Sequence, residues 1–232
     1  MIDQFHVICH PYILDVVDVI ANGHCGYRCI AALLGMGEDS WPLIRHDLFK
    51  ELSQYRDDYA RLLGSYDRVE ELRKSLLVDS TSGGNMDKWM TIPDMGYVID
   101  NKYNVILVCL SLVQNMTILP LRSTPPVDIR QHRMISIGHV NSSHFVQVKL
   151  QDGCPIPMVD MIWSHYCYPE ARAWSSFYVK LQDGCPIPMI DMIWSHYCYP
   201  EARAWSSFSV SRMQKFAELI GDNCSYVDLH CD

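Results

Sequence analysis

Apolar side chains recur every three to four residues in the first third of the chain, the spacing of one helix face. A first helix is predicted from Ser40, which would cap it, to Tyr55. A second, shorter helix is predicted over residues 59–66. A third is predicted to begin at Asp67, which forms a capping-box-like pair with Glu70. The apolar side chains on one face of each predicted helix are typical of helices that pack on a core.

The pattern then changes to that of strands. Residues 86–101 predict one more helix, with its start or a kink at Pro93. Residues 104–113 are continuously apolar and rich in β-branched side chains, as expected of a central strand covered on both faces. Residues 116–121 contain a proline and predict a strand at a sheet edge, and residues 134–150 predict a hairpin. The expected fold class is α/β (α+β), a small central β-sheet flanked by helices.

A candidate nucleophile follows the first strand-like stretch. The segment VIANGHCGYRCIAALLGMG, residues 19–37, reads as a strand end, a tight turn and a helix with Cys25 in its first turn. A thiol at the positive end of a helix is stabilised as the thiolate. Gly23 permits a positive φ, so the backbone N–H groups of Gly23 and His24 can face a developing oxyanion. The turn therefore predicts a nucleophile and an anion hole for acyl transfer.

The base for such a reaction has to come from another part of the chain. His24 directly precedes the thiol, so its side chain diverges from it. His144 begins the second arm of the predicted hairpin just after a polar turn, and it is the preferred base. His139 lies on the other arm and is the second choice. Cys29, one helical turn after Cys25, is expected to be a core residue.

Charge and cysteine content narrow the classes of partner. The 232 residues include 19 basic and 27 acidic side chains, which give a formal charge of −8. Without a run of Lys or Arg, nucleic-acid binding is not expected, and a cationic partner fits better. The longest apolar run, residues 105–113, is too short to cross a bilayer. Ten cysteines without a secretory leader indicate reduced thiols and an intracellular protein of the cytoplasm or nucleus.

Three groups of histidine and cysteine were weighed as zinc ligands. They are His165 with Cys167, His196 with Cys198, and Cys224 with the His230–Cys231 pair. None has the paired C-x₂-C spacing that is typical of structural zinc sites. We therefore expect neither a metal nor a cofactor.

A tandem duplication dominates the chain after the hairpin. The two copies match from VKLQDGCPIPM to the end of ARAWSSF, except for Val159 in the first and Ile190 in the second. Two copies are too few for a solenoid, so one copy is expected to be dispensable. The expected organisation is a catalytic core (1–150), the duplication 148–209 (148–178 and 179–209) and a C-terminal helix and tail that pack on the core (210–232).

Two stretches carry a resemblance to a known family. NGHCGYRCIAAL resembles the nucleophile segment of the OTU (ovarian tumour) deubiquitinating cysteine proteases, and SSHFVQVKL is similar to the family's late His-aromatic strand. More narrowly, the run from KWMTIPDMGYVIDNKYNVILVCLS to GHVNSSHFVQVKLQDGCPIP is similar to OTU domains of plant transposon-related proteins. The resemblance covers roughly residues 12–160, plus VSRMQKFAEL near the end.

The resemblance implies a papain-like α/β fold and a thiol-dependent hydrolase. The implied substrate is an isopeptide bond after the C-terminal glycine of ubiquitin, polyubiquitin or a ubiquitin-like modifier. Cys25 would be the nucleophile and His144 the base, with no cofactor. Oligomeric state and linkage preference are not implied.

The chain departs from the family pattern at two positions. Asn22 stands where the family usually has an aspartate, three residues before the cysteine. Val146 stands where many members place an acid or amide that orients the histidine. Asn22 could orient the imidazole through its amide oxygen or shape the anion hole, and Asp18 or Asn141 could orient the imidazole instead.

These departures leave a second function open. A catalytically impaired OTU-like domain would act as a ubiquitin-binding module, a relic of a mobile element. The intact Cys25 and His144 favour the enzyme, whereas Asn22, Val146 and the duplication favour the module. A thiol hydrolase unrelated to ubiquitin is the third hypothesis.

Overall fold

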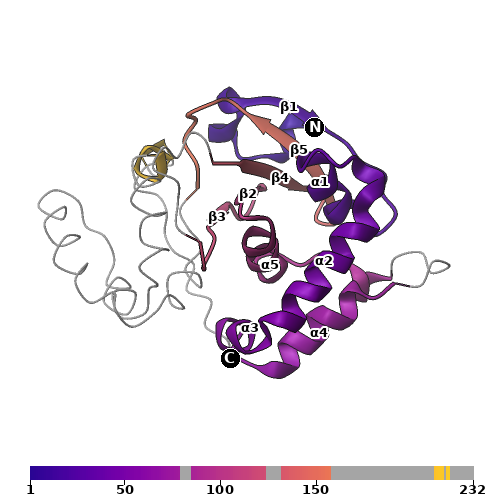
Figure 1. The fold of residues 1–232 in the computed structure, drawn as a ribbon. Coiled ribbons are helices and arrows are strands. Elements are labelled where there is room, and N and C mark those ends of the chain that lie inside the picture. The colour runs from indigo at the N-terminus through magenta and orange to yellow at the C-terminus, as the bar shows by residue number, and fades with distance from the viewer. Residues whose placement is uncertain (79–84, 124–131, 158–211, 217, 220–232) are drawn as a thin grey trace, which may run out of the picture.

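A computed structural model of the chain describes residues 1–78, 85–123, 132–157, 212–216 and 218–219 (Figure 1). Its helices are α1 (Cys25–Leu33), α2 (Trp41–Gln54), α3 (Arg56–Leu62), α4 (Tyr66–Leu76) and α5 (Asp94–Tyr103). Its 3₁₀ turns are η1 (Ile2–Gln4), η2 (Val7–Tyr12), η3 (Glu38–Ser40) and η4 (Met86–Lys88). Its strands are β1 (Ile13–Val17), β2 (Ile106–Leu110), β3 (Met116–Ile118), β4 (Met134–Val140) and β5 (His144–Leu150).

The described strands form one mixed sheet in the order β1-β5-β4-β2-β3. Strands β2 and β4 pair in parallel, and the other neighbours are antiparallel. Every residue of β2 is buried, as the continuous apolar run predicts, and β3 is an edge strand. The predicted hairpin is also present, with β4 and β5 joined by a turn at residues 141–143.

The helices form two layers beside this sheet (Figure 1). Helix α1 packs on β4 and β5, and α5 packs on β2 and β3. Helix α2 contacts α1, α4 and α5, while α3 packs on α4. The predicted fold class, a small sheet flanked by helices, is therefore confirmed.

The caps of two helices differ from the sequence predictions because the hydrogen bonds of nearby serine side chains differ from those expected. The Ser40 hydroxyl donates to the carbonyl of Met36 (2.8 Å), so it does not cap α2. The cap of α4 is Ser65, whose side chain accepts the amide of Arg68, rather than Asp67. Within the predicted range 86–101, α5 begins at Asp94 directly after Pro93, so the start predicted at Pro93 is confirmed.

The predicted helix over 59–66 is also displaced. Helix α3 already begins at Arg56 and ends at Leu62, and Tyr66 starts the next helix. Gly64 separates the two helices with a φ of 82°, which is accessible to glycine at little cost. The turn chemistry of glycine, rather than the apolar spacing, therefore sets this boundary.

Two described segments lie at the beginning of the duplication and directly after it. Residues 151–157 follow β5 and end where the Thr117 hydroxyl donates to the carbonyl of Pro157 (2.7 Å). Residues 212–216 are helical, and Arg212 donates through its guanidinium to the carbonyl of Cys154.

Some sequence predictions lie outside the described residues. Among them are most of the duplication, the tail after residue 219 and the histidines and cysteines considered and rejected as zinc ligands, His165, Cys167, His196, Cys198, Cys224, His230 and Cys231. Among the described helices, none combines the length and the apolar character that a membrane span requires.

Candidate active site

Cys25 is the first residue of α1, as the sequence predicts. Its side chain is buried, with 8% of the residue exposed. The first amides of a helix lack intrahelical partners, and the helix dipole adds a positive potential at the same end. Both effects place hydrogen-bond donors and a positive potential at the end of α1 that carries the sulfur.

The sulfur lies beside the beginning of β5. The backbone N–H of Phe145 donates to Sγ of Cys25 at 3.4 Å. Phe145 directly follows His144, so a contact across 120 positions of sequence brings the thiol to the residue next to the predicted base. The packing of α1 on β5 therefore unites the two halves of the candidate site.

The imidazole of His144 has an acidic partner. Its Nε2 lies 2.7 Å from Oδ1 of Asp18, and the same oxygen accepts the backbone N–H of Val19 at 2.8 Å. The hydrogen bond from His144 lowers the pKa of Asp18 below its usual value, against a weaker opposing effect of burial. Asp18 is therefore an ionised acceptor at neutral pH.

This contact fixes the tautomer of the histidine. An ionised carboxylate only accepts hydrogen bonds, so Nε2 of His144 carries the proton. In the neutral ring, Nδ1 then has the free lone pair that can take a proton from a thiol. Asp18 thus contacts His144, and Cys25 contacts the residue that follows His144, an order that fits a nucleophile, a base and an orienting acid.

The orienting group could not be chosen from the sequence, which left Asn22, Asp18 and Asn141 open. The structure pairs Asp18 with His144. Asn141 lies in the hairpin turn with a φ of 51°, and its backbone N–H donates to Gln4. The signal that could have singled out Asp18 is its place one residue after β1, because β1 pairs with β5.

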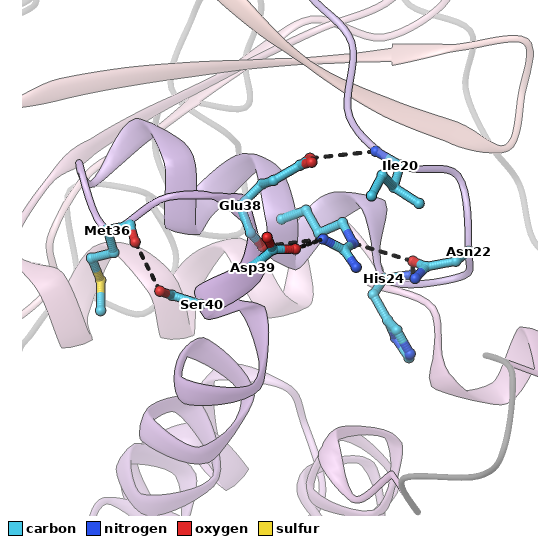
Figure 2. A network of polar contacts seen from close by, with 8 residues as sticks. Ile20, Asn22, His24, Met36, Glu38, Asp39 and Ser40 are labelled. Atoms are coloured by element: carbon cyan, nitrogen blue, oxygen red, sulfur yellow. Dashed lines mark hydrogen bonds and ion pairs between the residues drawn. The ribbon is translucent and has the colours of Figure 1, made fainter.

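The side chain of Asn22 makes its hydrogen bonds to the turn and to α1, and not to His144 (Figure 2). Its Oδ1 accepts the backbone N–H of His24 at 3.3 Å and Nε of Arg28 at 3.4 Å. Gly23 has a φ of 80°, which the sequence allowed for and which a side chain would make costly. Of the roles that the sequence left open for Asn22, these contacts within the turn favour shaping the anion hole over orienting the imidazole.

His24 has a structural environment of its own. Its ring stacks on Trp41, with centroids 3.8 Å apart and planes 14° apart, and its Nδ1 lies 2.9 Å from Nη2 of Arg45. Burial, and then the charges of Arg45 and Arg28, lower the pKa of His24 to about 4. Because a guanidinium only donates, Nδ1 of His24 is the acceptor and the ring is neutral.

The alternative base, His139, pairs with Phe145 across β4 and β5. The two rings meet in a tilted contact with centroids 4.8 Å apart. Burial, followed by the charge of His144, lowers the pKa of His139. The hydrogen bond to a carboxylate is made by His144, so the geometry favours His144 as the base.

Two further residues shape the start of α1. Cys29 is fully buried, and burial raises the pKa of its thiol, as expected of a core cysteine. Gly26 lies directly under the side chain of Met90, which would overlap a β-carbon at that position. The helix that carries the thiol therefore approaches the 85–93 segment closely.

The comparisons with known proteins are limited to solved structures. No family model and no curated protein matches the chain. Solved structures similar to the chain include OTU domains. The viral OTU domain protease from Farallon virus is 16% identical, with a TM-score of 0.45, over 63% of this chain and 89% of that one.

Two other solved structures give similar values. The Hazara virus OTU, solved bound to ubiquitin, is 14% identical, with a TM-score of 0.42, over 61% of this chain and 83% of that one. The OTU domain of OTUD1 is 14% identical, with a TM-score of 0.40, over 58% of this chain and 84% of that one.

Proposed function

We propose that this chain is an OTU-type cysteine protease that hydrolyses isopeptide bonds at the C-terminus of ubiquitin or a ubiquitin-like modifier. The observation that carries the proposal is the arrangement of Cys25 at a helix start, beside a strand whose first residue, His144, is bonded to Asp18. This arrangement supports acyl transfer by a thiol. The choice of ubiquitin rests on the sequence resemblance of the nucleophile and histidine segments.

The first half of the reaction forms a thioester. Nδ1 of His144 takes the thiol proton, and the sulfur of Cys25 attacks the carbonyl carbon, whose π electrons move to oxygen. Backbone amides at the start of α1 stabilise that oxyanion. When the carbonyl re-forms, the carbon–nitrogen bond breaks, and the leaving lysine amine receives the proton from His144.

The second half releases the modifier. His144 removes a proton from water, the hydroxide attacks the thioester, and the carbon–sulfur bond breaks to regenerate the thiolate. Asp18 holds the imidazole in the tautomer that both halves require and stabilises the imidazolium between them.

The competing function is a ubiquitin-binding module without activity. The apolar Val146 at the usual orienting position favours the module, because it leaves the histidine without an acid on its own strand. Asp18 compensates for this loss from another strand end. We therefore prefer the enzyme.

Release of a fluorophore from the C-terminus of ubiquitin tests the proposal. We expect turnover by the wild type and its loss in Cys25→Ala and His144→Ala. His139→Ala is the matched control, because it removes the neighbouring histidine and should keep most of the activity. Wild-type protein that binds ubiquitin without turning over would establish the module, and equal losses in both histidine variants would contradict the assignment of the base.

The proposal extends to the setting of the protein. A thiol nucleophile works only in its reduced form, so we propose an intracellular location in the cytoplasm or nucleus. The proposed partner is ubiquitin, polyubiquitin or a ubiquitin-like modifier, with no cofactor, metal, nucleic acid or membrane.

A further inference from the structure

Arg28 is a buried cation one turn after the nucleophile in α1. Its side chain is 8% exposed. A buried guanidinium is costly unless its donors are satisfied. Here they reach Oδ1 of Asn22 at 3.4 Å, the carbonyl of Glu38 at 3.5 Å and Oδ1 of Asp39 at 2.9 Å.

The loop that precedes the nucleophile is attached to η3 at two points. Asn22 is attached through Arg28, and the backbone N–H of Ile20 donates to Oε2 of Glu38 at 3.4 Å. Within the loop, Asn22 also accepts the N–H of His24. One amide oxygen therefore ties the turn both to itself and to the helix that follows.

This loop connects two groups of the candidate site. Asp18 lies at its beginning, and Cys25 follows its end. The Asp18 side chain is 60% exposed, so burial does little to hold it against His144. The Val19 N–H on Oδ1 and the course of the loop place the carboxylate, and the same loop sets the turn that leads into Cys25.

We propose that Arg28 is a positioning residue for the nucleophile turn, and that Asn22 is its acceptor. Resting on the proposed function, this inference deepens it by giving Asn22 a role other than orienting the imidazole. Arg28 acts through the turn and touches neither the substrate nor the reacting atoms. We call the hydrogen bonds of Asn22 Oδ1 with the His24 N–H and with Arg28 the clasp. An aspartate at position 22 would offer the same acceptor to both donors, so Asn22→Asp should preserve the clasp.

The test is a double-mutant cycle on Asn22 and Arg28, with ubiquitin–fluorophore turnover as the first readout. Asn22 is exposed, so we expect Asn22→Ala to leave the protein folded. We expect Asn22→Ala to lower kcat by about 10- to 100-fold with KM within about twofold, because small misplacements of reacting groups are costly. Asn22→Asp should recover kcat to within about threefold of wild type, and Arg28→Lys should fall between.

The double variant and a control variant complete the cycle. Asn22→Ala combined with Arg28→Lys should be no slower than the slower single variant, because both act on one clasp. Ser40→Ala removes a neighbouring hydrogen bond to Met36 that lies outside the clasp, so it is the control and should match wild type. The proposal would be overturned if the kcat losses of the two single variants multiply in the double variant. It would also be overturned if Asn22→Ala keeps the wild-type kcat.

A second readout needs no ubiquitin. The pH profile for alkylation of Cys25 by iodoacetamide, followed by peptide mass spectrometry, reports the pairing of the thiol with the imidazole. We expect Asn22→Ala to slow alkylation near neutral pH severalfold and Asn22→Asp to restore it. If wild type fails to cleave ubiquitin but this difference is present, only the proposed function fails. Coinciding alkylation profiles of wild type and Asn22→Ala would overturn the inference itself.

Discussion

The carboxylate that contacts His144, Asp18, comes from the end of a strand other than the one that carries the histidine. The position two residues after His144 is an apolar core residue, Val146, which is fully buried. The carboxylate instead reaches Nε2 of His144 from the end of β1. The imidazole is thus oriented across two neighbouring strands.

Asp18→Asn tests this contact. The amide keeps the shape of the carboxylate but loses its charge, so it neither enforces the same tautomer nor stabilises the imidazolium. We expect kcat for ubiquitin–fluorophore to fall by at least about tenfold, and by less than the roughly four decades known for serine proteases, since a thiol is more acidic than a hydroxyl.

The pH dependence of that loss provides a further check. The pKa of Asp18 is lowered by His144, so the wild-type carboxylate stays charged through the range from about pH 5 to 8. Asp18→Asn should therefore lower kcat at every pH across that range. Asp15→Asn is the control, because that carboxylate is exposed and bonded to Lys149. An equal loss in both variants would argue against a specific role of Asp18.

At the residue scale, Cys25 and His144 can be singled out from the sequence more readily than Asp18. Cys25 and His144 stand in local patterns, a strand–turn–helix junction and a hairpin arm, that are readable from neighbouring residues. The choice among Asn22, Asp18 and Asn141 depends on the pairing of β1 with β5, which joins segments more than 120 positions apart. Nothing local encodes that pairing.

Among the elements, apolar spacing predicts where helices and strands lie but not how they begin. The central strand, the edge strand and the hairpin follow from side-chain pattern because burial on a sheet is periodic. The starts of α4 and α5 depend on single hydrogen bonds and on backbone geometry, so Ser65 caps where Asp67 is expected. The parallel pairing of β2 with β4 is likewise a tertiary property.

Helix α5 carries a buried acid that should make folding stability depend on pH. Asp100 is fully buried. Its Oδ1 accepts the Asn101 amide at 3.0 Å, and its Oδ2 has no hydrogen-bond partner in the described part of the chain. Burial raises the pKa of Asp100 well above its usual value, so the folded protein holds a proton that the unfolded chain releases.

Asp100→Asn should remove this dependence. A raised folded-state pKa contributes stability that is present below the unfolded pKa and is lost as pH rises toward the folded one. Wild type should therefore lose up to roughly 1.4 kcal/mol per pH unit relative to Asp100→Asn between about pH 5 and 8. Urea unfolding at several pH values measures this difference. The exposed Asp67→Asn is the control, and parallel curves for wild type and Asp100→Asn would contradict an un-ionised Asp100.

On the scale of the whole molecule, the first copy of the duplication is partly built into the core. Val148 lies in β5, and Cys154 and Ile156 are buried beyond it. The chain returns to the same place after the duplication, where Arg212 contacts the carbonyl and the sulfur of Cys154. The two ends of the intervening stretch are therefore anchored side by side, which favours tolerance of a change in its length.

Removal of one copy should leave the core intact. Deleting 148–178 or 179–209 yields nearly the same chain, since the copies differ only at Val159 against Ile190 and Tyr178 against Ser209. Both deletions should keep ubiquitin–fluorophore turnover, with Tm within about 4 °C of wild type. Loss of activity in both would show that the second copy contributes to the fold or to the site.

The central claim is that the sulfur of Cys25 attacks the C-terminal carbonyl of ubiquitin with help from His144. The most direct measurement is the reaction of the full chain with ubiquitin that carries a thiol-reactive group in place of its C-terminal glycine. The account predicts an adduct heavier by one ubiquitin, mapped by mass spectrometry to Cys25, absent in Cys25→Ala and much slower in His144→Ala. Wild-type protein that forms no adduct, or one attached to a different cysteine, would contradict it.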